Sequence, residues 1–375
     1  MNLSFWEKNS YFNKIDIVII GSGIVGLSAA LSLKKKNKRL NIIVLERGML
    51  PMGASSKNAG FACFGSSSEL LLDLKNHTED EVFSLVEKRW KGLLQLRKNL
   101  GDKAIDFLNL GGYEVFDSKT EFDQCNEKMG YFNNHLYSII GKKQVFMNAD
   151  SKIKNFGFKK VKHLIVNTFE SQIDTGRMMA ALINKVRGLG IEIMNGFEVL
   201  QFSDDGKKVE IVSKNGIHIS CKKVIVATNG FAKQLLPKYA VNPARAQVLI
   251  TNPIKNLKIK GTFHYDEGYY YFRNIGNRLL LGGGRNLDFK TEETMEFGLT
   301  QLVQNKLEDL LKTMILPGKD FTIDMRWSGI MGVGPQKKSI VRSVSENVFC
   351  AVRMGGMGVA IGSLIGKEVA DLVVD

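Results

Sequence analysis

The sequence contains few cysteines, and their spacing is not that of a disulfide framework or a zinc site. Its 375 residues include four, which are far apart and form no C-x-x-C pair: Cys63, Cys125, Cys221 and Cys350. The five histidines show no metal-ligand spacing either. We therefore expect no metal site and a protein of the reducing cytoplasm.

The sequence also lacks a Pro-rich linker, a low-complexity tract, an internal repeat and a long basic tail. The missing linker suggests that its lobes are interleaved along the chain. The net charge is +14, which can favour nucleic acid, an acidic membrane surface or an anionic ligand. Basic runs such as Lys34–Lys36 are short and scattered, and no nucleic-acid-binding motif is present. We expect no nucleic-acid partner.

One segment resembles a membrane span. Ile15 to Leu33 is 19 residues long and carries the single charge of Asp16. However, Gly21 and Gly23 interrupt it, β-branched residues fill its first part, and helix formers fill its second part. We expect a strand, a turn and a helix here, and no transmembrane segment.

The turn in this segment carries a dinucleotide-binding fingerprint. Residues 16–20 predict a buried strand, 24–36 a helix, and 41–45 a second strand that ends at Glu46. Between the first strand and the helix stands G-x-G-x-x-G: Gly21, Ser22, Gly23, Ile24, Val25 and Gly26. Such glycines allow a tight turn, a close approach of the backbone to pyrophosphate, and helix–strand packing. Glu46 predicts hydrogen bonds to the ribose hydroxyls and disfavours a 2′-phosphate.

Two further glycine-rich stretches favour FAD over NAD. The stretch after the second strand could contact more of the cofactor, and its candidate contacts are Ser55, Ser56, Lys57, Asn58, Ala59 and Gly60. A second cluster opens the last predicted helix, and it comprises Gly355, Gly356, Met357 and Gly358. A helix N-terminus with few side chains suits the electron-rich edge of a flavin ring.

The remaining patterns are coarser. Residues 68–100 and 174–188 predict helices, and 101–150 predicts strands and loops. Residues 223–227 predict a buried strand, and 244–285 a strand-rich, aromatic region. Further helices are expected at 291–311 and 358–373.

Taken in order, these motifs resemble the D-amino-acid-oxidase-like FAD-dependent oxidoreductases, a family that includes glycine oxidase, sarcosine oxidase and γ-glutamylputrescine oxidase. The resemblance covers nearly the whole chain. Besides the fingerprint, Glu46-Arg47 and Gly53-Ala54-Ser55-Ser56, it rests on stretches 224–230, 235–237, 243–247, 281–285 and the terminal glycines. We also assign cofactor contacts to Arg47, Val199, Ala227, Thr228 and Gly230.

The resemblance implies an α/β fold in which a Rossmann-type FAD-binding lobe is interleaved with an α+β substrate lobe on a mostly antiparallel sheet. We draw the FAD lobe as 14–75, 150–236 and 325–375, and the substrate lobe as 76–149 and 237–324. The family also implies hydride transfer from a substrate carbon to flavin N5, which gives an imine that water hydrolyses. The implied partners are a small amine or amino acid and oxygen or another electron acceptor.

Hydride transfer needs positioning groups more than an acid–base triad. Tyr271 and Arg273 share one face of a predicted strand with Tyr269, and could hold a substrate carboxylate. Arg245 and Arg285 are further candidates. Lys57 lies in the loop expected to approach the flavin, where its cation could stabilise developing charge.

One position departs from the family pattern. The stretch Trp327–Gly332 resembles the segment whose arginine clamps the substrate carboxylate in the amino-acid oxidases, and Met331 stands in its place. This favours an amine, or an acid held in another way. The flavin-linking cysteine of sarcosine-oxidase-like members is absent there too, so we expect non-covalent FAD.

Two other functions remain open. A related domain carries out flavin-dependent modification of the tRNA wobble uridine, and the basic charge fits that function. A flavin-bound protein could also act as a scaffold or sensor without catalysis. The sequence does not distinguish an oxidase from a dehydrogenase.

Overall fold

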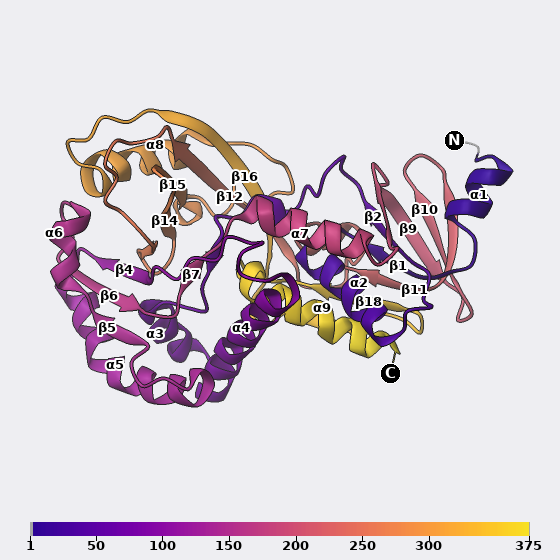
Figure 1. Ribbon diagram of the computed structural model, residues 1–375, viewed down its shortest axis with the longest axis horizontal. Helices are drawn as coiled ribbons and strands as arrows, with labels where there is room; N and C mark the ends of the chain where they lie inside the picture. The colour runs from indigo at the N-terminus through magenta and orange to yellow at the C-terminus, as the bar shows by residue number, and fades with distance from the viewer. Residues whose placement is uncertain (1–2, 375) are drawn as a thin grey trace.

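The computed structural model describes residues 3–374. Figure 1 shows two lobes side by side, each built on one large sheet, with long helices between and around them. Early, middle and late segments of the chain contribute to each lobe, as the colours show. The predicted interleaved α/β architecture is therefore confirmed.

The first sheet has eight strands in the order β17-β18-β11-β1-β2-β8, and the hairpin of β9 and β10 extends β11. Its strands are β1 (Ile15–Ile20), β2 (Ile42–Glu46), β8 (Glu192–Asn195), β9 (Val199–Asp204), β10 (Val209–Ser213), β11 (His218–Val226), β17 (Ile340–Ser343) and β18 (Val348–Val352). The central strands pair in parallel, and β1 and β2 are buried on both faces. Such burial explains their runs of Ile and Val.

Small residues bring the helices of this lobe very close together. The helices are α2 (Ile24–Lys36), α4 (Glu79–Leu100), α7 (Thr175–Arg187) and α9 (Gly358–Val374). A Cβ on Gly366 of α9 would lie 2.6 Å from Ser28 Cβ of α2, and one on Gly92 of α4 would lie 2.3 Å from the Ala360 carbonyl of α9. The helix that carries the C-terminal glycines is thereby fixed against the helix that follows the fingerprint.

The second sheet also has eight strands, in the order β16-β12-β15-β14-β13-β4-β6-β5. They are β4 (Gly112–Phe116), β5 (Phe146–Asn148), β6 (His163–Asn167), β12 (Asn242–Thr251), β13 (Thr262–Tyr265), β14 (Tyr270–Ile275), β15 (Arg278–Gly283) and β16 (Ile323–Val333). All neighbours are antiparallel except β13 and β4. A mostly antiparallel sheet was predicted, and this prediction is confirmed.

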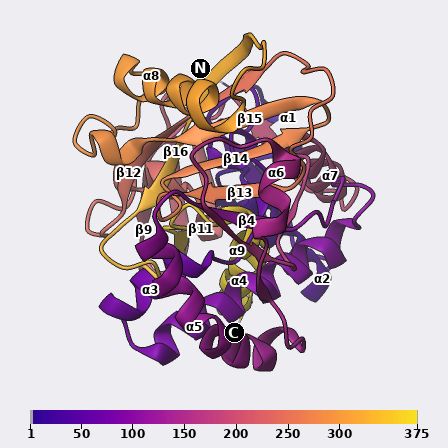
Figure 2. The same cartoon turned by 90° about the vertical axis from the view of Figure 1, so that its left-hand side faces the viewer.

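The other elements surround these sheets. They are α1 (Phe5–Tyr11), β3 (Phe61–Ala62), α3 (Ser67–Asn76), α5 (Lys119–Ile140), α6 (Ile153–Phe156), β7 (Ser171–Gln172) and α8 (Gln301–Leu310), with short helical turns at 54–56, 150–152, 229–234, 285–287 and 311–315. In Figure 2, α8 lies above β12 and β15, and α3 and α5 lie below β4. Strands β3 and β7 pair with each other.

Two sequence predictions differ from the structure. Residues 101–150 contain α5, a helix of 22 residues, where strands and loops were expected. Polar residues are mixed with aromatics in this segment and mask the helical repeat of its buried side chains, which include Phe132 and Leu136. The helices predicted over 68–100 are confirmed as α3 and α4, and Thr78 caps the start of α4. The helix expected over 291–311 begins at Gln301.

The lobe boundaries drawn from the sequence remain a prediction. Strand β6 lies within 150–236 and β16 overlaps 325–375, yet both pair with strands of the second sheet. Within residues 3–374, no helix combines the length and apolarity needed to cross a membrane.

Candidate active site

The glycine fingerprint forms a tight turn between β1 and α2. Gly21 has φ +110°, and a Cβ there would lie 2.8 Å from the Ala227 carbonyl oxygen at the end of β11. A Cβ on Gly26 would lie only 2.0 Å from the Gly21 carbonyl oxygen. Both positions therefore require glycine for packing, and the turn brings the end of β11 against the start of α2.

Glu46 is buried where β2 ends beside this turn. Its Oε2 accepts hydrogen bonds from the Ser22 amide at 3.2 Å and from the Ser22 hydroxyl at 2.7 Å, and its Oε1 accepts one from the Gly48 amide at 3.1 Å. These contacts fix the carboxylate at the edge of the dinucleotide turn. A fixed acceptor at this edge suits ribose hydroxyls.

The stretch 53–60 folds over the N-terminus of α2. Gly23 caps the helix without a side-chain hydrogen bond, and the Ser55 hydroxyl accepts one from the Ile24 amide at 3.0 Å. A Cβ on Gly23 would lie 2.8 Å from that same hydroxyl oxygen. The two glycine-rich stretches predicted to bind the cofactor are thus in direct contact. Val25 lies in the first turn of α2.

Asn58 holds the rest of this loop in shape. Its side-chain nitrogen donates to the Ser55 carbonyl at 2.8 Å, and its oxygen accepts from the Gly60 amide at 2.8 Å. The Thr175 hydroxyl of α7 donates to the same oxygen. Ser56 is exposed and donates to the Pro51 carbonyl, which removes it from the interior of the site.

Cations and aromatic rings line one side of the loop. The Arg47 guanidinium lies 3.6 Å from the centre of the Phe231 ring, and Phe231 lies beside Phe297. The Lys57 ammonium lies 5.2 Å from the centre of the Phe297 ring. These cation–π contacts use both basic residues, so each has a structural role whether or not a cofactor is bound.

The end of β11 brings three more predicted contacts to the turn. Ala227 touches Gly21, as described above, and a Cβ on Gly230 would lie 2.7 Å from the Met331 carbonyl oxygen. The Thr228 hydroxyl oxygen is buried and has no hydrogen-bond partner within residues 3–374. Val199 packs instead against the core of the first sheet.

The C-terminal glycine cluster meets β16. Gly355 and Gly356 have positive φ values of +58° and +84°, and the Gly355 amide donates to the Gly332 carbonyl at 3.0 Å. A Cβ on Gly356 would lie 3.4 Å from the Met331 sulfur. Met357 ends this turn, and Gly358 starts α9. The structure therefore places the cluster beside Met331.

These residues fit FAD. Glycines at 21 and 26 let the turn pack tightly against β11 and the start of α2, and the N-cap residue Gly23 has no side chain to cover the helix N-terminus, where Ser55 engages the Ile24 amide. A buried hydroxyl without a partner, such as that of Thr228, is costly unless a ligand or water satisfies it. The turn, Glu46 and stretch 53–60 would hold the cofactor.

One face of the second sheet lies against the stretch 53–60, which we call the flavin loop because it is predicted to contact FAD. Cross-strand neighbours on this face form the row Trp327, Val248, Gly282, Tyr271, His264 and Glu114. The Tyr271 ring folds over Gly282, and a Cβ on that glycine would lie 2.6 Å from the ring. Phe61 of β3 packs edge-on against both Tyr271 and His264. Burial raises the pKa of Tyr271 to about 12, so the phenol stays protonated.

Arg273 ties the flavin loop to this sheet. One terminal nitrogen donates to the Gly60 carbonyl at 3.0 Å and to the Ile173 carbonyl at 2.8 Å, and the side chain is buried. Burial lowers its pKa to about 10, so the guanidinium remains charged near neutral pH. Trp327 of β16 also connects the loop to the sheet, because its indole nitrogen donates a hydrogen bond to the Lys57 carbonyl at 2.9 Å.

The other candidate arginines are also engaged. Arg245 makes a bidentate pair with Glu292 at 2.7 and 3.2 Å, and both side chains are buried. Arg285 stacks on the Phe289 ring at 4.6 Å. Met331 stands on β16 opposite Ala244. Arg245 is therefore occupied by a carboxylate, whereas Arg285 is held by an aromatic ring.

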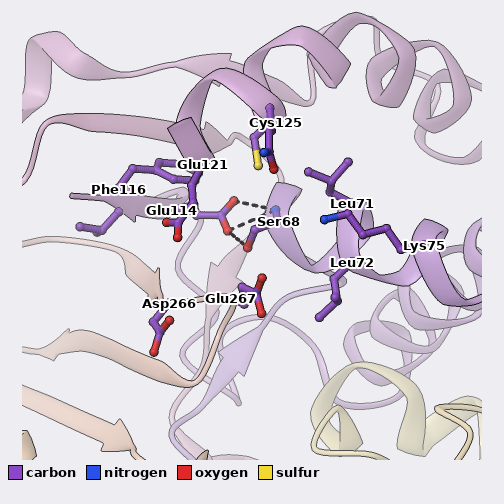
Figure 3. A pocket seen from close by; sticks show the side chains of 12 residues that line it. Ser68, Leu71, Leu72, Lys75, Glu114, Phe116, Glu121, Cys125, Asp266 and Glu267 are labelled. Carbon is purple, nitrogen blue, oxygen red and sulfur yellow. Dashed lines mark hydrogen bonds between the residues drawn. The ribbon is translucent and has the colours of Figure 1, made fainter. Parts of the chain in front are cut away.

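A separate cavity of about 40 Å³ opens at the Glu114 end of the row (Figure 3). Ser68 of α3 donates to the Glu114 carboxylate, and Glu121, Asp266 and Glu267 also line the cavity. Burial raises the pKa of Glu114, although serine side chains hydrogen-bond to it. None of the residues predicted to bind FAD lines this cavity.

The sequence analysis did not identify Phe61, Trp327, or the pair formed by His264 and Glu170. It also did not predict that Asn58 holds its own loop in shape through hydrogen bonds. Glu170 Oε2 lies 3.1 Å from His264 Nε2, and both side chains are buried. Burial alone would lower the pKa of His264, but the Glu170 carboxylate raises it to about 9. The alternation of side chains along the strand at residues 262–265 could have predicted that His264 lies on the face of the sheet opposite to that of Phe263. No sequence signal pointed to Glu170.

Comparison with known proteins identifies the family of this chain. The family model described as FAD dependent oxidoreductase matches residues 16–372. Glycine oxidase from Bacillus subtilis is 23% identical over 372 residues, which cover 96% of this chain and 93% of that protein. Probable oxidoreductase OrdL from Haemophilus influenzae is 22% identical over 392 residues, which cover 96% and 82%.

Solved structures share the fold at low identity. Glycine oxidase from Geobacillus kaustophilus superposes with a TM-score of 0.78 at 19% identity, covering 96% of this chain and 95% of that one. L-proline dehydrogenase from P. horikoshii gives 0.76 at 18% identity, covering 96% and 93%. The predicted resemblance, fold class and FAD cofactor are confirmed. The roles of individual site residues remain predictions.

Proposed function

Because this chain belongs to the FAD dependent oxidoreductase family, we propose that it oxidises a carbon–nitrogen bond of a small amine or amino acid. Bound FAD supplies the hydride acceptor of the reaction, and the protein supplies binding, orientation and a dry site. Similarity to proteins named glycine oxidase, D-amino acid dehydrogenase and L-proline dehydrogenase supports this substrate class.

One observation carries the proposal: hydrogen bonds attach the flavin loop to the face of the second sheet that carries Trp327 and Tyr271. Arg273 donates to Gly60, Trp327 donates to Lys57, and a Cβ on Gly329 would lie 3.1 Å from the Lys57 Cβ. A substrate on this face would meet the flavin at short range. Such positioning is the main protein contribution that hydride transfer requires.

The chain's own residues would then orient the substrate. The Tyr271 hydroxyl forms no hydrogen bond with other residues in the described part of the chain, and its pKa of about 12 keeps it a donor. It would donate to a polar group of the substrate, while Phe61 and Trp327 exclude water. Arg273 acts as a positioning residue, because its hydrogen bonds go to the loop backbone.

The geometry favours an amine over a simple α-amino acid. Met331 offers a thioether where the family uses a guanidinium, Arg245 is paired with Glu292, and Arg273 holds the loop. An unpaired carboxylate in such a pocket would be costly to bury. An acid substrate would need another anchor.

Replacing Met331 by arginine should improve the oxidation of small neutral amino acids. The new guanidinium would pair with the substrate carboxylate, and a hydrogen bond to a charged group contributes about 1.5–3 kcal/mol, so the Michaelis constant for glycine or D-alanine should fall roughly tenfold or more. The measurement is the rate of flavin reduction against acid concentration.

Met325→Arg is the matched control, because Met325 lies on the same strand but is 60% exposed. It adds the same charge and should leave the Michaelis constant unchanged. If the wild type is reduced rapidly by glycine and Met331→Arg gives no improvement, the missing anchor does not limit this enzyme.

Acid precipitation of the yellow protein should release all of its FAD into the supernatant. All four cysteines are buried, and none lies in the stretch 327–332 where related enzymes attach the flavin. The measurement is flavin absorbance in supernatant and pellet after precipitation. Flavin that stays in the pellet through washing would show a covalent link and contradict this expectation.

A further inference from the structure

Three potential metal ligands meet in the interior, away from the fingerprint turn. The Cys63 sulfur, a Glu170 carboxylate oxygen and a His264 ring nitrogen all lie within 4.8 Å of one another, and all three residues are buried. They come from the segment after β3, the residue before β7, and strand β13. The sequence analysis predicted no metal site, because these residues are widely separated along the chain.

The surrounding contacts hold two of these ligands in place. The second Glu170 oxygen accepts hydrogen bonds from the Phe64 and Gly65 amides, both at 3.3 Å. The other oxygen is thereby left to His264 and the space beside Cys63. Phe61 packs edge-on against the His264 ring with the ring centres 5.3 Å apart. Such outer contacts orient ligands in metal sites.

We propose that Cys63, Glu170 and His264 bind a zinc ion. Thiolate, imidazole and carboxylate together are ligands that Zn²⁺ accepts, at about 2.0–2.3 Å each. Ligand atoms of a tetrahedral site are then roughly 3.3–3.8 Å apart, so a small contraction of the observed group would close the site. Water would fill the fourth position.

The charges balance in both states. Without metal, a neutral thiol, a carboxylate and an imidazolium sum to zero. With zinc, the dication faces a thiolate, a carboxylate and a neutral imidazole, which also sum to zero, so binding releases two protons. A buried site can therefore accept the ion without a net buried charge.

The competing explanation is a buried imidazolium–carboxylate pair that happens to lie beside a thiol. That pair would satisfy His264 and Glu170, but it gives Cys63 no partner. A zinc ion would instead join the flavin-loop side of the molecule, through Cys63, to strand β13 of the second sheet. The proposal does not depend on the proposed oxidation, because zinc content and FAD content are measured separately.

The test is the zinc content of holoprotein made in zinc-supplemented cells and purified without chelator. Elemental analysis should find about one zinc per chain. Cys63→Ser and His264→Gln should each reduce retained zinc at least tenfold, with FAD content as the check on folding. The matched controls are Cys125→Ser, another buried cysteine, and His163→Gln, another histidine paired with a carboxylate. Both controls should keep the metal.

X-ray absorption at the zinc edge of the wild type provides a test that needs no variant. It should show one sulfur neighbour at about 2.3 Å among nitrogen and oxygen neighbours. Zinc bound through nitrogen and oxygen alone would indicate another site, such as the acidic cavity at Glu121, and would overturn the proposal. Absence of zinc from the wild type, or equal zinc in wild type and both ligand variants, would overturn it as well.

Discussion

Replacing Gly26 by alanine should yield a protein that purifies without FAD. The added Cβ would lie 2.0 Å from the Gly21 carbonyl oxygen and 3.2 Å from Ile19 Cγ2, so α2 would have to move away from β1. That movement would displace the turn and the helix N-terminus that would face the pyrophosphate. We expect a loss of at least about 3 kcal/mol in binding free energy, which is more than a hundredfold in affinity. The measurement is FAD per chain after gel filtration.

Gly130→Ala is the matched control, because Gly130 lies within α5 and a Cβ there would meet nothing within 4 Å. It should keep full FAD and gain slightly in stability, since alanine favours the helix. Circular dichroism of both variants would separate loss of cofactor from loss of fold. Full flavin occupancy in Gly26→Ala would show that this turn is not the pyrophosphate site.

Arg273→Met should weaken both the fold and the binding of FAD. The change leaves the buried Ile173 carbonyl without its guanidinium donor and removes one of two donors to the Gly60 carbonyl. Hydrogen bonds to charged groups contribute about 1.5–3 kcal/mol each and two are lost, so the free energy of unfolding should fall by about 3–6 kcal/mol. Denaturant unfolding and FAD titration of the apoprotein measure the two effects.

Arg278→Met is the appropriate comparison. Arg278 begins β15, is only half-buried, and donates to the Thr251 carbonyl at 3.0 Å at the far end of the hairpin. Its loss should cost less stability and leave FAD binding unchanged. Another result would assign Arg273 a different role: a raised Michaelis constant for acids with normal stability and FAD affinity would make it the substrate clamp.

The predictions for the cofactor side come from local patterns in the sequence, and the roles of the individual residues there remain predictions. The fingerprint, Glu46 and the helix after Gly358 are each set by residues close together in the chain, so spacing reveals them. The structure adds why the spacing is required, since Gly26 leaves no room for a Cβ. Helix α5 was missed because its aromatic residues and scattered polar residues gave no clear helical repeat.

The substrate side depends on register between distant strands, and sequence spacing does not encode it. Tyr271 and Arg273 were correctly placed on one face, but the use of Arg273 to hold Gly60 follows only from the docking of the loop on the sheet. The same holds for Cys63, Glu170 and His264, which meet because β3, β7 and β13 converge. The departure at Met331 was predicted from the resemblance and remains a prediction, and the fold shows which residues surround Met331.

The most direct test of the proposed function is anaerobic mixing of the FAD-bound protein with amines, D- and L-amino acids, and N-methyl amino acids. We predict that at least one amine or amino acid bleaches the visible flavin band in proportion to its concentration, and that the matching carbonyl product forms after hydrolysis. Failure of every compound to reduce a flavin that dithionite still reduces would contradict carbon–nitrogen oxidation. Salt-sensitive binding of tRNA in that case would favour the wobble-uridine function instead.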